Sequence, residues 1–134
     1  MPEKKTLERA KKDKAQGKAP STQAGEFVRE EMEHIRKGKH GARSTKQAIA
    51  IGLSKARKAG VKLKPPAKGQ TSERTRRGAE QAYRKGQNER TQAPSPRRSR
   101  ATLGALKREG RGAATTKALS KQARQTAQRR RART

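Results

Sequence analysis

The chain lacks residues on which several common kinds of protein depend. It has no cysteine and no tryptophan, and only one phenylalanine and one tyrosine among 134 residues. Without cysteine there is no disulfide, no thiolate zinc site and no thiol nucleophile. Acidic residues are also scarce, 11 against 38 basic ones, which leaves a formal net charge of +27. A chain this cationic is typical of proteins that bind a polyanion, and nucleic acid is the first candidate.

Large apolar side chains are few and unevenly placed. Nine of the fifteen lie between Phe27 and Leu63, and alanine supplies most of the remaining apolar fraction. Segments this charged and this poor in apolar groups do not offset a backbone entropy of about 1–2 kcal/mol per residue, so we expect them to be disordered on their own. No apolar run is long enough for a membrane span or a secretory leader. We therefore expect a cytoplasmic protein that does not use a membrane.

The apolar segment has the pattern of two helices. The first helix runs from about Gln23 to Lys37. The second helix begins with a capping box at Ser44 and ends near Ala59. Glycines 38 and 60 supply the two C-terminal stops. The short connection predicts an antiparallel hairpin. Its expected core consists of Phe27, Val28, Met32, Ile35, Ile49, Leu53 and Ala56.

The predicted fold class is therefore all-α: a small antiparallel helical hairpin with long, largely disordered or transiently helical basic arms. The hairpin covers residues 21–64, and the arms cover 1–20 and 65–134. Within the second arm, residues 112–117 echo residues 41–46, and each of the two segments opens an alanine-rich stretch. This similarity has two possible explanations. It indicates either a weak second hairpin over 99–131 or a chance match in a biased composition.

The window Gly38 to Leu63, GKHGARSTKQAIAIGLSKARKAGVKL, is similar to a domain-of-unknown-function family of small basic bacterial proteins. The resemblance extends back to about Glu26, implies one discrete module of bacterial origin, and brings no known activity. By composition only, the arms resemble the tails of linker-histone-like bacterial proteins. The residues that carry the resemblance are Gly38, His40, Gly41, Arg43, Ser44, Gln47, Ala48, Ile49, Ala50, Leu53, Ala56, Arg57 and Gly60.

Catalytic groups are nearly absent. Glu30 and His34 share one face of the first helix at i, i+4, which suits two metal ligands or an acid–base pair, but a surface ion pair explains the spacing better. The sequence has no expected strand, and so no glycine-rich phosphate loop that follows one. We therefore expect no enzyme activity, no bound metal and no cofactor.

Two short motifs leave alternatives open. His40 lies beside Arg43 just before the second helix, where it is either part of a phosphate-binding corner with Lys46 and the first amides of that helix, or a polar turn residue. Ser95-Pro96-Arg97-Arg98 is either a turn that lies in a DNA minor groove or a linker between cationic stretches.

The expected function is non-sequence-specific nucleic-acid binding by phosphate neutralisation, on duplex DNA and associated with the nucleoid. Single-strand binders stack bases on aromatic side chains, and this chain offers only Phe27 and Tyr83. The alternatives are a ribosome- or structured-RNA-associated protein, and a protein-interaction module that acts through the acidic first helix. The expected phosphate contacts are Lys39, Arg43, Lys46, Lys55, Arg57, Lys58, Arg97, Arg98, Arg100, Arg129, Arg130, Arg131 and Arg133.

Overall fold

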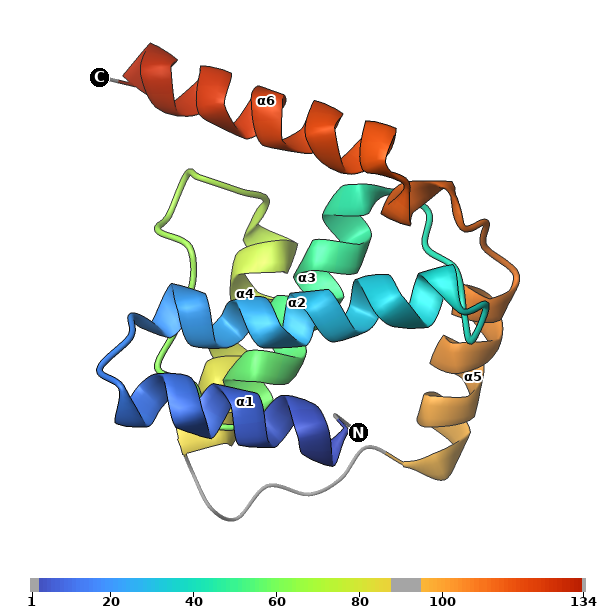
Figure 1. Ribbon diagram of the computed structural model, residues 1–134, viewed down its shortest axis with the longest axis horizontal. Helices are drawn as coiled ribbons and strands as arrows, with labels where there is room; N and C mark the ends of the chain where they lie inside the picture. Colours follow the sequence, from blue (N-terminus) through green and yellow to red (C-terminus); the bar gives the residue numbers. More distant parts are fainter. Residues whose placement is uncertain (1–2, 88–94, 134) are drawn as a thin grey trace. The chain divides into compact units, whose positions relative to one another are not determined.

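A computed structural model describes residues 3–87 and 95–133, and all of the regular structure in these ranges is helical (Figure 1). This confirms the all-α prediction. None of the described helices is long and apolar enough to span a bilayer. The elements are α1 (Lys4–Ala15), α2 (Pro20–Arg36), α3 (Thr45–Lys58), α4 (Glu73–Gln87), α5 (Pro96–Lys107), the 3₁₀ turn η1 (Gly112–Ala114) and α6 (Thr116–Arg133).

Helices α2 and α3 end as the glycine positions predict. At the end of α2, Gly38 takes a φ of +77°, and the Lys39 amide donates to the His34 carbonyl at 2.9 Å. At the end of α3, Gly60 takes a φ of +101°, and the Val61 amide donates to the Ala56 carbonyl at 3.1 Å. Both are Schellman motifs, in which glycine adopts the left-handed conformation that other residues avoid.

The expected disordered arms are not confirmed, because α1, α4, α5 and α6 lie within them. The expectation rested on the lack of large apolar groups, whereas these segments bury small ones, among them Ala10, Ala79, Ala82, Ala113 and Ala114. Alanine costs no side-chain entropy on burial and lets backbones approach closely. The division at residues 20/21 and 64/65 stays a prediction.

The described residues form two compact units, to which α2 and α3 both contribute. Unit 1 contains residues 3–30 and 50–87. Its core packs Ala10 of α1, Ala24 and Phe27 of α2, and Ala56 of α3, with α1 lying along α2 (Figure 1). The helices α2 and α3 meet at Gly52, where an added Cβ would lie 2.7 Å from the Val28 Cα.

Unit 2 contains residues 31–49 and 95–133. The end of α5 and the segment after it hydrogen-bond to the loop between α2 and α3. The Gly41 amide donates to the Leu106 carbonyl at 2.8 Å, and the Ala42 amide donates to the Gly110 carbonyl at 3.0 Å. Ala113 and Ala114 are buried there. Leu103 of α5, in contrast, keeps 43% of its surface exposed. Residues 106–114 therefore belong to unit 2.

The seven predicted core residues divide between the two units. In unit 1, Phe27 and Ala56 are buried, and Val28 and Leu53 are half-buried. In unit 2, Met32 and Ile35 are buried, and Ile49 is half-buried.

Candidate nucleic-acid interface

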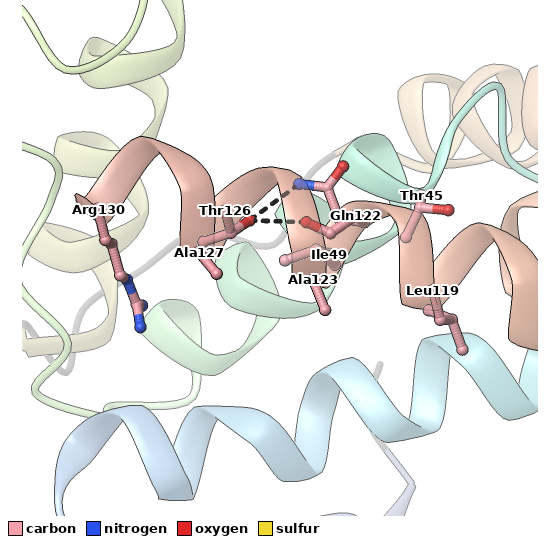
Figure 2. Close-up of a pocket in the computed structure, with 8 residues that line it drawn as sticks. All are labelled: Thr45, Ile49, Leu119, Gln122, Ala123, Thr126, Ala127 and Arg130. Atoms are coloured by element: carbon pink, nitrogen blue, oxygen red, sulfur yellow. Dashed lines mark hydrogen bonds between the residues drawn. The ribbon is translucent and has the colours of Figure 1, made fainter. Parts of the chain in front are cut away.

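Helix α6 has mostly neutral side chains on one side and a row of cations on the other. Within unit 2, the neutral side of α6 faces the first turns of α3 across a groove of about 310 Å³ (Figure 2). Arg130 lies at one end of this groove, and the Thr126 hydroxyl donates to the Gln122 carbonyl within the helix at 3.0 Å. The lining residues are Thr45, Ile49, Leu119, Gln122, Ala123, Thr126, Ala127 and Arg130.

The opposite side of α6 is cationic. Lys117, Lys121, Arg124 and Arg131 follow one another at helical spacing, and all four are exposed. Three and four residues apart on a helix are neighbours, so these side chains form one row about half a turn away from the groove residues. The whole helix contains no acidic residue. We call this row the α6 cationic face.

Helices α6 and α3 begin in the same way. The Thr115 hydroxyl accepts from the Ala118 amide at 3.1 Å, and the Ser44 hydroxyl accepts from the Gln47 amide at 3.2 Å. These are matched N-caps, at equivalent places in the two echoing hexapeptides. Each of the two hexapeptides thus caps the start of a helix. The second hairpin over 99–131 stays a prediction.

The two hexapeptides also meet in unit 2. The Thr45 hydroxyl donates to the Ala113 carbonyl at 2.6 Å, which places the start of α3 beside η1. Of the expected phosphate contacts in this part of the chain, Lys39, Arg43 and Lys46 are exposed.

Two arginines that sequence analysis did not single out flank the start of α6. Arg36 and Arg111 line a depression of about 390 Å³ together with Ala114, Thr115 and Thr116. The Arg36 Nε donates to the Ala114 carbonyl at 3.1 Å, and the Arg111 guanidinium lies so close over Gly38 that an added Cβ there would be 2.7 Å from its Nη2. The hydrogen bond to Ala114 orients the Arg36 guanidinium.

His40 does not belong to a phosphate-binding surface. It is buried, with Nε2 3.1 Å from the Glu31 Oε2 and Nδ1 2.9 Å from the Gly41 carbonyl oxygen. Glu30, which we expected on the surface beside His34, is buried, and its Oε1 accepts from the Glu3 amide. His40 is thus a polar residue of the loop between α2 and α3, and its burial does not suit a phosphate ligand.

A second group of cations lies in unit 1, where α4 docks on the end of α3. Gly86 permits this approach, since an added Cβ would collide with the Arg57 carbonyl oxygen. Desolvation, and then the positive charges of Lys85 and Lys55, lower the pKa of the Lys58 ammonium. An anion bound there would offset the smaller part of this shift, the repulsion from Lys85 and Lys55.

Arg57 differs from the neighbouring lysines. It is buried, and its Nε and Nη2 donate to the carbonyls of Leu63 and Lys64, both at 3.2 Å. Burial lowers the pKa of its guanidinium. Its position corrects the sequence-based expectation of a phosphate contact, because Arg57 fixes the chain that leaves α3.

The remaining expected contacts lie on α5 and α6. Ser95 caps α5, with its hydroxyl accepting from the Arg98 amide at 3.2 Å, so Ser-Pro-Arg-Arg is a helix start here and neither a linker nor a free turn. The side chain of Arg133 lies outside the described part of the chain. The exposed residues are Arg97, Arg98, Arg100, Arg129, Arg130 and Arg131.

The comparisons with known proteins reach the first half of the chain. No curated protein and no solved structure matches. The match to a family model begins before the window Gly38 to Leu63 and includes α1, which sequence analysis had placed in an arm. Over residues 4–68, the chain is similar to a family of unknown function, DUF6496.

Proposed function

We propose that the protein binds nucleic acid through the phosphates, with duplex DNA favoured over structured RNA and without strong sequence preference. The observation that carries the proposal is the α6 cationic face of Lys117, Lys121, Arg124 and Arg131, opposite the side that faces α3. The neutral side chains of α6 face α3 across the groove, and the four exposed cations lie on the other side of the helix.

The dimensions of α6 suit a duplex. Its 18 residues extend about 27 Å at 1.5 Å per residue. A DNA duplex carries one phosphate charge per about 1.7 Å of axis, so cations along such a helix find phosphates without a particular base sequence. Each contact releases condensed counterions, and this release supplies the free energy of binding.

Other cations would add to this contact. We assign phosphate contacts to Lys39, Arg43 and Lys46 around the start of α3, to Lys55 and Lys58, and to the exposed arginines of α5 and α6. We leave out Arg57, because its guanidinium is buried against backbone carbonyls.

A charge-matched pair of variants tests the proposal. In the first, Lys117, Lys121 and Arg124 become Gln; in the second, Lys4, Lys5 and Lys11 of α1 become Gln, so both lose three exposed charges. At 0.1 M salt each phosphate contact is worth about tenfold in affinity, so we expect the α6 variant to bind duplex DNA about 10³-fold more weakly and the α1 variant to be much less affected. Equal losses would show that only net charge matters and that α6 is not the interface.

Structured RNA is the second candidate for the ligand. Duplex DNA is favoured over single strands because Phe27 is buried and Tyr83 half-buried, which leaves no exposed aromatic platform among the described residues. Competition between a DNA duplex and an A-form RNA duplex of equal length decides between the two. If the RNA duplex displaced bound DNA more strongly than an equal DNA duplex does, the protein would instead be a ribosome- or structured-RNA-associated one.

A partner protein on the acidic first helix is the less supported alternative. Glu30 and Glu31, two of the four glutamates of α2, are buried and so offer no acidic surface. We therefore propose a binding protein that acts on nucleoid DNA in the cytoplasm, and not an enzyme.

A further inference from the structure

The only two histidines of the chain come together with one buried glutamate. Glu31 and His34 lie three residues apart on α2, and therefore on one face of the helix. The Schellman turn at Gly38 then reverses the chain and returns His40 to the same place. One ligand atom from each of Glu31, His34 and His40 lies within 4.8 Å of the other two.

The hydrogen bonds of His40 leave a position for a cation. The Gly41 carbonyl oxygen, 2.9 Å from Nδ1, can only accept, so Nδ1 carries the proton. In the neutral imidazole the lone pair is then on Nε2, which faces the Glu31 Oε2 at 3.1 Å. Two acceptors this close repel each other unless a positive charge lies between them.

A metal ion satisfies this arrangement as well as a proton does. In a tetrahedral zinc site with bonds of about 2.0–2.2 Å, neighbouring ligand atoms are about 3.3 Å apart. The Nε2–Oε2 distance of 3.1 Å is close to that value. A backbone carbonyl on the other ring nitrogen is also the usual support of a metal-bound histidine, because it fixes the tautomer and the ring orientation.

The remaining geometry fits the same reading. The His34 and His40 rings have centroids 6.0 Å apart and planes at 86°, so they approach each other edge to face without being stacked. Glu31 is fully buried and His40 is 7% exposed, whereas His34 is half-buried. The pair of buried ligands is therefore preorganised, and His34 lies between the buried ligands and solvent.

We propose that Glu31, His34 and His40 bind one divalent transition-metal ion, with Zn²⁺ the best match to two imidazoles and one carboxylate. Mg²⁺ and Ca²⁺ fit poorly, since both prefer an all-oxygen ligand set. Three protein ligands leave the fourth tetrahedral position open. Sequence analysis expected no metal because it saw only the helical pair Glu30 and His34, and the loop that returns His40 is a tertiary feature.

The proposed ion would also act on the fold of unit 2. It would join the last turns of α2 to the loop that carries Gly41 and Ala42, whose amides bond to residues 106 and 110. An ion that binds only the folded state stabilises that state in proportion to its occupancy.

The test uses the full chain, purified through high salt to remove nucleic acid. Zn²⁺ binding is measured by calorimetry, and Co²⁺ is added separately because tetrahedral imidazole and carboxylate ligation gives it visible absorption bands. We expect one ion per chain and a rise in melting temperature with Zn²⁺. Because the chain has no cysteine and only these two histidines, imidazole ligation must involve His34 or His40. His40 belongs to this cluster alone, whereas His34 also lies near Glu3 and Glu30.

Two variants and a matched control make the result decisive. His34→Gln replaces the half-buried ligand, so the fold should survive, and His40→Gln replaces a buried one. Each should weaken Zn²⁺ binding by at least about tenfold, the lower end of the loss seen even for supporting residues. Glu33→Gln, on the same helix but outside the cluster, should bind Zn²⁺ as the unmodified chain does. The proposal is overturned if the unmodified chain takes up no Zn²⁺, or if His34→Gln keeps the same affinity and Co²⁺ spectrum.

Discussion

The contact of α2 with α3 makes a sharp prediction about Gly52. Alanine is normally better than glycine inside a helix by about 0.8–1.0 kcal/mol. At position 52, however, the added Cβ would lie 2.7 Å from the Val28 Cα and 2.9 Å from the Val28 amide nitrogen and Cγ2. Carbon atoms in favourable contact are about 3.5–4.0 Å apart, so the helices would have to separate.

The expected magnitude follows from these distances. Overpacking a core costs about 1–3 kcal/mol, and a clash that involves backbone atoms belongs at the upper end. After the gain in helix propensity, Gly52→Ala should destabilise unit 1 by about 2 kcal/mol. Gly25→Ala is the matched control, because Gly25 lies on α2 with nothing within 4 Å of an added Cβ. That control should stabilise the protein by about 0.5–1 kcal/mol.

Urea denaturation followed by helical circular dichroism measures both changes. Opposite signs for the two glycines are the expected outcome. If Gly52→Ala were as stable as Gly25→Ala, the close approach of α2 to α3 at Val28 would be refuted.

Two further predictions concern the caps and the lysine cluster. Ser44→Ala and Thr115→Ala should each cost about 1 kcal/mol of stability, because each leaves a helix N-terminal amide without its acceptor. The control Ser120→Ala, on the exposed surface of α6, should change stability by less than about 0.5 kcal/mol. Equal effects of the three substitutions in thermal melts would contradict the assignment of Ser44 and Thr115 as N-caps. The pKa of Lys58 is lower in the folded chain than in the unfolded chain, so the protonated lysine destabilises the fold at neutral pH. This destabilisation is relieved as the pH rises from the folded pKa to the unfolded pKa. Lys58→Gln should therefore be more stable than the unmodified chain at neutral pH but not at alkaline pH. Lys62→Gln, on the exposed connection after α3, should show no such dependence on pH. A stability difference for Lys58→Gln that does not change with pH would refute the destabilising role of the Lys58 charge.

The rules of helix capping correctly predicted where α2 and α3 end and where α3 begins. The ends of α2 and α3 follow from Gly38 and Gly60, and the start of α3 follows from Ser44, because capping is decided by a few neighbouring residues. In the capping box, Gln47 departs from the standard pattern, since its Oε1 accepts from the Arg43 amide and not from the Ser44 amide.

The packing of the helices outside the expected hairpin was not predicted, for a physical reason. The burial of Ala10, Ala79 or Ala113 depends on which backbone comes close, and composition carries no information about that approach. A segment without large apolar side chains therefore looks the same in sequence whether it is solvated or packed.

The candidate site was predicted in kind but not in place. The spacing of Lys117, Lys121 and Arg124 was readable as one helical face, yet its neutral complement consists mainly of alanine, glutamine and threonine, which give a weak periodic signal. The burial of Arg57 and His40 required knowledge of the backbone carbonyls around them.

The salt dependence of duplex binding tests the central claim most directly. The full chain is titrated onto a labelled DNA duplex by fluorescence anisotropy at a series of salt concentrations. The account predicts a linear fall of log K with log salt, with a slope of about −3.6 or steeper, since the four cations of the α6 cationic face contribute about −0.9 each. A slope near zero would contradict phosphate neutralisation as the basis of this protein's function.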